Sequence, residues 1–228
     1  MGILAILGGL VLVAIVFGPQ YWVKSVTKRH GVERPDFPGT GGELADHLLS
    51  QSQIIDMEVE LTNRGSHFDP QAKMVRLEPE HFHGKSVSAV AVAAHEVAHA
   101  IQFAEGNRML MLRQRLVGLA GIADKFAGVF FMLAPLAGLV VRSPGAFFGI
   151  LLIGILFIAI RIIVHLVTLP VEWDASFNKA LPILEEGGYL HEDDLPAARQ
   201  VLKAAALTYV SAALVTLLDL TRWIRLLR

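Results

Sequence analysis

The chain has 228 residues, a formal net charge of −1 and no cysteine; 54% of its residues are hydrophobic and 18% are charged. A soluble domain is typically ~45–50% apolar and ~25% charged, so this composition excludes an ordinary soluble protein and also a disordered one. The balanced charge argues against a nucleic-acid partner. Without cysteine, disulfides, thiol catalysis and Cys-ligated metals are excluded, and any metal site must use His, Asp or Glu.

The first expected element is an apolar segment at residues 3–23, in which residues 3–17 carry no charged or strongly polar side chain. As a helix rising ~1.5 Å per residue, it is long enough to cross a bilayer core of ~30 Å. Tyr21 and Trp22 at its end are typical of the membrane interface. The basic start and the cleavage site of a signal peptide are missing, so we expect a retained anchor at residues 1–23.

Residues 24–115 have the composition of a soluble domain with two capped helices. Thr40 and Glu43 have the spacing of a capping box, which predicts a helix to about Ser50. Ser86 is a good N-cap for a second helix over residues 87–105, which Gly106 would end.

Two strands are expected between these helices. Residues 56–61 alternate polar and apolar side chains, and residues 73–77 form a second short strand beyond a turn at Arg64-Gly65. Together they predict a small hairpin or edge sheet. The strand at 56–61 is either plain scaffold or the edge to which an extended peptide adds.

Apolar stretches return in the second half of the chain. Stretches at about 117–141 and 146–168 are joined by a short loop, which predicts an antiparallel transmembrane hairpin over residues 116–169. A last uncharged stretch, 204–218, lies in a C-terminal helix at 199–228. A weak polar stripe on that helix leaves two alternatives open, spanning the membrane or packing against the other helices.

The motif that carries chemistry is His95-Glu96-Val97-Ala98-His99, an H-E-x-x-H pattern in the second capped helix. Residues four apart lie on one helical face, so both imidazoles can meet one tetrahedral Zn²⁺. The glutamate after the first ligand contacts the metal-bound water and acts as general base. The rest of this helix is built from small apolar residues, and burying two histidines and a glutamate in it is costly without a partner such as a metal.

Catalytic zinc needs a third protein ligand, and several residues are candidates. Glu105 has the spacing of a metzincin ligand, but Gln102 replaces the glycine that such a motif uses for its turn. His67 and Asp69 are a second possibility. The best candidate is Glu172, the first acidic residue after the expected hairpin.

Glu172 lies in the segment 170–198, which we expect to return to the catalytic domain, in a helix that Pro170 could begin. Asp174 is either a competing ligand or a hydrogen-bond partner of a ligating imidazole. His81 and His83 alternate around Phe82, which places them on one face of an extended segment, either lining the cleft or solvated.

Three pieces of the chain, Phe68-Asp69-Pro70, the residues 90–102 around the motif, and Leu169–Ser176, resemble the YugP-type family of membrane-bound neutral zinc metallopeptidases. The resemblance extends from about residue 20 to the C-terminus. It implies a gluzincin-like site with His95, His99 and Glu172 as zinc ligands and Glu96 as general base. One residue departs from the family pattern, because Ala98 stands where glycine is expected.

The sequence therefore predicts a mainly α membrane protein, with a zincin-like catalytic domain and a small β edge, anchored by three or four transmembrane helices. The expected function is a zinc metallopeptidase whose partners are the lipid bilayer and a peptide or protein substrate; the sequence leaves the oligomeric state open. The alternative is a non-enzymatic membrane scaffold or metal-binding protein that keeps a zincin shape, although the presence of Glu96 disfavours it.

The membrane orientation follows from metal chemistry and from charge. Residues 99 and 172 can share a metal only if an even number of spans separates them, and the expected hairpin supplies two. Basic residues flank the spans on the catalytic side, namely Lys24, Lys28, Arg29, Arg34, Arg108, Arg113 and Arg115. Positive charge favours the cytoplasmic side, so we expect a bacterial cytoplasmic membrane with the active site facing the cytoplasm.

Overall fold

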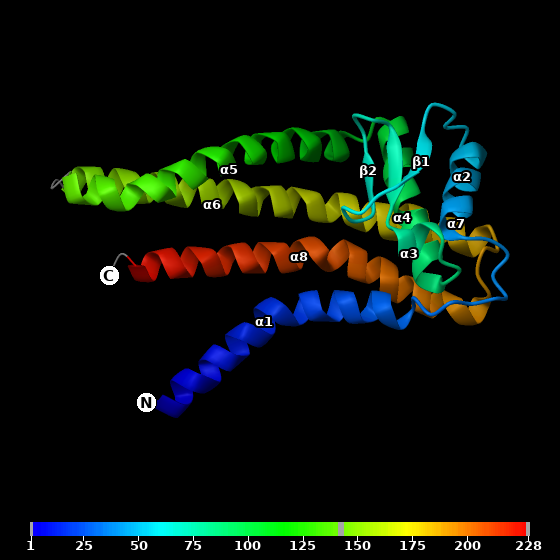
Figure 1. Ribbon diagram of the computed structural model, residues 1–228, viewed down its shortest axis with the longest axis horizontal. Helices are drawn as coiled ribbons and strands as arrows, with labels where there is room; N and C mark the ends of the chain where they lie inside the picture. The colour runs from blue at the N-terminus through cyan, green and yellow to red at the C-terminus, as the bar shows by residue number, and fades with distance from the viewer. Residues whose placement is uncertain (1, 141–143, 227–228) are drawn as a thin grey trace.

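The computed structural model describes residues 2–140 and 144–226 as a mainly helical chain with a small three-stranded sheet (Figure 1). In chain order the elements are α1 (Gly2–Arg29), α2 (Gly41–Gln51), β1 (Glu58–Leu61), β2 (His67–Asp69), β3 (Met74–Leu77), α3 (Pro79–Phe82), α4 (Val87–Ala104), α5 (Arg108–Val140), α6 (Pro144–Trp173), the π-helical η1 (Asp174–Ala180), α7 (Leu181–Glu186), the 3₁₀ turn η2 (Glu192–Asp194) and α8 (Leu195–Leu226). The sheet and the short helices gather at one end, and four long helices extend away from it.

The H-E-x-x-H helix α4 is the centre of the compact end. It begins as predicted, because the Ser86 hydroxyl accepts a hydrogen bond from the backbone N–H of Ala89. The predicted capping box of α2 is also confirmed, with Thr40 and Glu43 bonding each other's backbone N–H groups. Helices α2 and α8, the η1 segment and the sheet all pack against α4. Its alanine-rich sequence permits this close packing on several sides.

The sheet has the order β1-β3-β2, with β1 parallel and β2 antiparallel to β3. A small sheet was predicted, but the hairpin reading of its two strands is wrong because β1 and β3 run parallel. The reason is β2, a third strand that the sequence did not reveal. It takes the chain back across the sheet, and at three residues it is too short to show a periodicity.

The prediction of an extended segment around His81 is also wrong. Pro79 occupies the first turn of the short helix α3, where its fixed φ is favourable, and the chain turns there instead of running straight. His81 is consequently buried, with Nδ1 2.9 Å from the Ser66 hydroxyl, whereas His83 is exposed.

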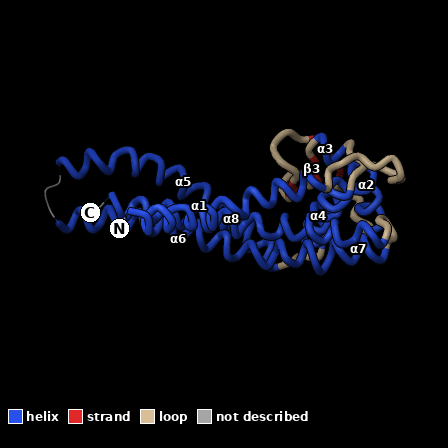
Figure 2. The backbone as a smooth tube through the Cα atoms, turned by 90° about the horizontal axis from the view of Figure 1, so that it is seen from below, coloured by secondary structure: helices blue, strands red, loops and turns tan. Residues whose placement is uncertain are grey.

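The long helices pack as an open row. α5 packs against α6, α6 against α8, and α8 against α1, so that the first and last helices of the chain are neighbours. Both termini lie at the far end of this row from the sheet (Figure 1), and the view from below shows the same separation of row and compact end (Figure 2).

Two helical stretches within the described residues are long and apolar enough to cross a membrane. Val87–Ala104 is mostly buried and is the core helix α4. In Leu152–Glu186 only 12% of the most apolar window is buried, and this stretch includes most of the expected span at 146–168. The expected spans at 3–23, 117–141 and 204–218 stay predictions, although each falls within one of the long helices α1, α5 and α8. Residue 141 lies outside the described residues.

Candidate metal centre and its cavity

Three of the predicted site residues meet at the junction of the compact end and the helical row. The Nε2 atoms of His95 and His99 lie 3.1 and 3.3 Å from Oε2 of Glu172. All three side chains are buried, and within the described part of the chain they form a group whose ligand atoms lie within 4.8 Å of one another. Two ligand atoms on one tetrahedral Zn²⁺ would be ~3.3–3.5 Å apart, given bonds of ~2.0–2.2 Å, so the spacing fits that ion.

Glu172 reaches this position from the end of a continuous helix. The prediction that Pro170 begins a helix is wrong. Pro170 lies inside α6, which runs from Pro144 to Trp173. A proline within a long apolar helix removes one backbone donor without ending the helix when neighbouring groups compensate. The carboxylate is thereby carried on the same rigid element as the apolar stretch before it.

Gln102 fixes the orientation of His99. Its amide nitrogen donates to the Val171 carbonyl at 3.0 Å and to the Asp174 carboxylate at 2.7 Å. Both partners are acceptors, so the amide oxygen of Gln102 faces Nδ1 of His99, 2.9 Å away, and accepts its proton. Asp174 therefore bonds Gln102 and not an imidazole, so the predicted direct hydrogen bond to a histidine is not seen among the described residues.

Ser176 fixes the orientation of His95 in the same way. Its hydroxyl donates to the backbone carbonyl of Leu202 in α8 at 3.1 Å, which leaves the oxygen as acceptor for the Nδ1 proton of His95, also 3.1 Å away. Ser176 follows Glu172 by four residues, so ligand and support lie on one side of consecutive turns.

These hydrogen bonds show why the site calls for a cation. With both Nδ1 atoms acting as donors, neutral His95 and His99 direct the lone pairs of Nε2 at the Glu172 carboxylate. Burial disfavours the imidazolium of His99, yet the adjacent carboxylate outweighs burial and raises the pKa of His99. Burial likewise opposes ionisation of Glu172, but His99 and His95 hold the pKa of Glu172 well below its usual range. Buried imidazole and carboxylate donors at this spacing form the kind of set that holds a divalent metal.

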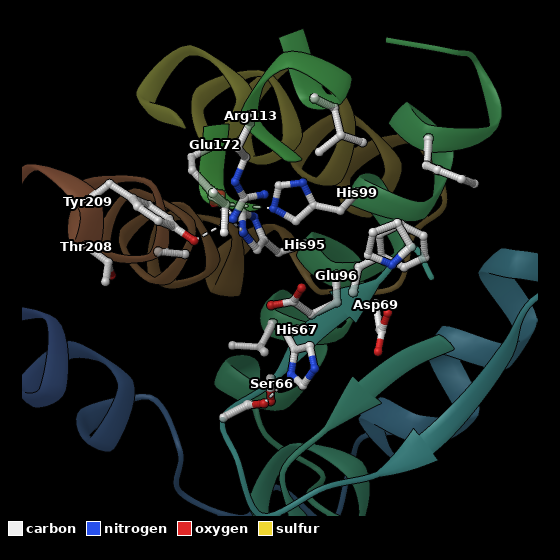
Figure 3. Close-up of a pocket in the computed structure, with 18 of the residues that line it drawn as sticks. Ser66, His67, Asp69, His95, Glu96, His99, Arg113, Glu172, Thr208 and Tyr209 are labelled. Atoms are coloured by element: carbon white, nitrogen blue, oxygen red, sulfur yellow. Dashed lines mark hydrogen bonds and ion pairs between the residues drawn. The ribbon is translucent and has the colours of Figure 1, made fainter. Parts of the chain in front are cut away.

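Two further side chains border the triad, as Figure 3 shows. Nη2 of Arg113 lies 3.2 Å from Oε1 of Glu172 and donates to the Tyr209 hydroxyl at 2.6 Å. Arg113 comes from α5 and Tyr209 from α8, so the guanidinium that pairs with Glu172 is itself held by a second helix.

The triad opens into a cavity of about 940 Å³, near the upper end of the range for ligand sites. Glu96 lines it beside the triad, and within residues 2–140 and 144–226 its carboxylate makes no hydrogen bond or ion pair. His67 lines the same cavity from β2, with Nδ1 donating to the Gly65 carbonyl at 2.8 Å. In Figure 3, Glu96 lies between the triad and His67.

The alternative third ligands do not join the metal-binding group. Asp69 lines the cavity, but its carboxylate accepts from the backbone N–H groups of Gln71 and Ala72 and pairs with Arg76. Backbone donation from Ala72 is the largest influence on the pKa of Asp69, which is lowered. Glu105 is exposed and pairs with Lys179 at 2.7 Å.

The fold and the donor set together define a helical protein whose H-E-x-x-H helix carries a buried His–His–Glu group. A family model described as "Putative neutral zinc metallopeptidase" matches residues 5–228, and the chain therefore belongs to that family. It is similar to the "Putative membrane protease YugP" of Bacillus subtilis (strain 168), with 34% identity over 211 residues, 91% of this chain and 89% of that protein. No solved structure matches the chain significantly.

Four supporting residues were not identified from the sequence. Gln102 and Ser176 could have been found, because each follows a ligand by three or four residues on a helix. Arg113 and Tyr209 carry no such signal, since they reach Glu172 from distant helices.

Proposed function

We propose that this chain is a membrane-bound zinc metallopeptidase in which His95, His99 and Glu172 hold the metal. The observation that supports it best is the convergence of two imidazole lone pairs on a buried carboxylate, with both histidine orientations fixed by Gln102 and Ser176. Zinc bound there would lower the pKa of its water to ~7 and polarise a substrate carbonyl.

Glu96 is the proposed general base. Its carboxylate faces the cavity without a partner among the described residues, so it is free to take a proton from the attacking water. It then delivers that proton to the amide nitrogen as the C–N bond breaks, which completes hydrolysis of the peptide bond. The alternative, a non-enzymatic scaffold of the same shape, gives no reason for a buried and unpaired carboxylate at this position.

The proposed substrate is a polypeptide in extended form. β2 is an edge strand, and residues 65–71 around it line the cavity. An extended chain can pair with the free side of such an edge. The strand considered for this role from the sequence, at 56–61, corresponds to β1, which lies at the opposite edge and does not line the cavity.

Exchange of Glu96 for glutamine tests the mechanism. Glu96→Gln should keep zinc and the fold but lose peptide hydrolysis by ~10²–10⁴-fold, because a neutral amide cannot accept the proton. The assay is casein cleavage, followed by mass spectrometry, together with metal analysis of the purified protein. Turnover at the wild-type rate by Glu96→Gln would refute the assigned role.

A second pair of variants tests the ligand set. Glu172→Ala should lose the metal, whereas Glu105→Ala should keep it, because only Glu172 lies with the two histidines. If Glu172→Ala retains zinc and Glu105→Ala loses it, Glu172 is not the third ligand.

We further propose that the long helices lie in a bacterial cytoplasmic membrane with the metal centre at its cytoplasmic face. The support is the exposed apolar surface of α6 and the basic residues that flank the expected spans. The chain has no native cysteine, so single cysteines at positions 31 and 144 can be labelled selectively. Position 31 should be labelled only from the cytoplasm and position 144 only from outside. The opposite pattern would reverse the orientation, and labelling of both positions from one side would contradict the hairpin.

A further inference from the structure

The row of long helices leaves an opening between its two ends. Within residues 2–140 and 144–226, no packing comparable to that of neighbouring helices joins α1 to α5 or α5 to α8. Both α1 and α5 nevertheless contribute side chains to the cavity, so the two helices border the same empty space. We call this opening the α1–α5 seam; it is lined by Lys24, Thr27, Leu110, Gln114, Val117 and Gly118.

The seam is continuous with the metal centre. The same cavity of about 940 Å³ is lined by the triad at one end and by the seam at the other. A Cβ atom added at Gly118 would meet no atom within 4 Å. The wall on α8 is formed by Ala205, Thr208 and Tyr209. The space between the helices is therefore not filled by the chain's own side chains.

The surface that continues from the seam is apolar. Val117, Leu119 and Ile122 on α5 are 50%, 59% and 54% exposed. Such an apolar surface is unfavourable in water but natural against lipid tails. Lys24 and Arg113 line the same cavity, and Arg113 lies 3.2 Å from Glu172 of the triad. The seam thus passes from a lipid-like to a polar environment over a short distance.

A polypeptide that leaves a bilayer has the same gradient, because an apolar helix is followed by a polar segment. Resting on the peptidase function proposed above, we propose that the substrate is a membrane-anchored polypeptide whose juxtamembrane segment enters the cavity sideways from the bilayer, through the α1–α5 seam. A polypeptide suits the site better than a free lipid. The free edge of β2 lines the cavity and offers a row of backbone donors and acceptors, and an extended polypeptide can form hydrogen bonds along that row whereas a lipid cannot.

Two glycines of α5 give a matched test. A Cβ atom added at Gly118 or at Gly121 meets nothing within 4 Å, but of the two glycines only Gly118 lines the cavity. Gly118→Trp should therefore fill the seam, whereas Gly121→Trp should leave it open. Both variants are compared with the wild type in vesicles of phosphatidylethanolamine and phosphatidylglycerol, with equal zinc content as the control for folding.

Two probes carry the same cleavable segment, taken from a casein site that the wild type cuts. One is a soluble fluorogenic peptide, and the other places the segment directly after an apolar single-span helix in the same vesicles. Gly118→Trp should lower kcat/KM for the anchored probe by at least ~10-fold and change the soluble probe by less than ~2-fold. Equal effects on both probes, no effect on either, or the same loss in Gly121→Trp would overturn the inference.

A second arm does not depend on cleavage. A photoreactive benzophenone amino acid replaces Val117, or replaces Leu156 on the exposed face of α6 as the control, in the Glu96→Gln chain. Position 117 should form adducts with the anchored helix in clear excess over position 156. Adducts with lipid alone, or equal yields at both positions, would refute the entry route. If position 117 forms adducts with the anchored helix but the wild-type protein cleaves neither probe, the peptidase function is refuted and the entry route stands.

Discussion

Replacement of Gln102 by alanine measures how much the metal centre depends on a residue that is not itself a ligand. The Gln102 side chain makes three hydrogen bonds, to Nδ1 of His99, the Val171 carbonyl and the Asp174 carboxylate. Partners of this kind fix the tautomer and direction of a ligating histidine, and their loss typically lowers metal affinity by ~10–100-fold. That range corresponds to ~1.4–2.7 kcal/mol of zinc-binding free energy.

The zinc-free protein should also be less stable. Gln102 is fully buried, so alanine leaves the Nδ1–H of His99 without its acceptor, at a cost of ~1–3 kcal/mol, and also removes the donor to the Val171 carbonyl. Gln102→Glu separates the two effects. It keeps an acceptor for His99 but cannot donate to Val171, so it should lose less zinc affinity than Gln102→Ala while still losing stability.

The assay is a zinc titration of the purified protein against a chromophoric chelator, with thermal unfolding of the zinc-free form alongside. Gln114→Ala is the control, because Gln114 lines the same cavity but its buried amide nitrogen has no hydrogen-bond partner in the described part of the chain. It should bind zinc as the wild type does. If Gln102→Ala binds zinc within ~2-fold of the wild type and of Gln114→Ala, Gln102 does not support the metal centre, because loss of a supporting residue should lower zinc affinity by much more.

Two other variants test neighbouring interactions. Ser176→Ala removes the acceptor for His95 and should lower zinc affinity by ~10–100-fold. Ser88→Ala changes a buried hydroxyl that has no partner among the described residues and should keep the wild-type zinc affinity; equal affinities in the two variants would contradict this. Asp69→Asn should keep zinc but unfold at a lower temperature near pH 7, because the carboxylate is stabilised by Ala72 and Arg76. The pKa of Asp69 is lowered in the folded chain. The ionised carboxylate therefore adds to the free energy of unfolding at a pH above the ordinary aspartate pKa of ~4, and this contribution is lost as the pH falls below that pKa. The difference in melting temperature should therefore shrink in acid, and a constant difference down to about pH 3 would count against it.

The sequence identifies the two histidines of the proposed metal site because their signal is local. The spacing of His95 and His99 places both imidazoles on one helical face in any fold that keeps the helix. Ser86 fixes where that helix begins, through a hydrogen bond to a residue three positions away. Glu172 was identified by its place after an apolar stretch and by resemblance, and the structure brings it to the two histidines.

The parts that the sequence did not predict depend on contacts between distant segments. β2 has only three residues, and its pairing with β3 is set by the fold and not by a pattern in the strand. Pro170 suggests a helix start in the sequence, but the surrounding apolar helix continues through it. Arg113 and Tyr209 meet beside Glu172 only because α5 and α8 both approach the end of α6.

The involvement of α8 has a consequence for how the protein matures. Ser176, which orients His95, is itself oriented by the Leu202 carbonyl, and Tyr209 on the same helix completes the surroundings of Glu172 through Arg113. Because α4 precedes α8 in the chain, the H-E-x-x-H helix is synthesised before the helix that supplies this support. The order of synthesis thus implies a delay, since His95 reaches the orientation described here only after α8 has packed against α4 and η1.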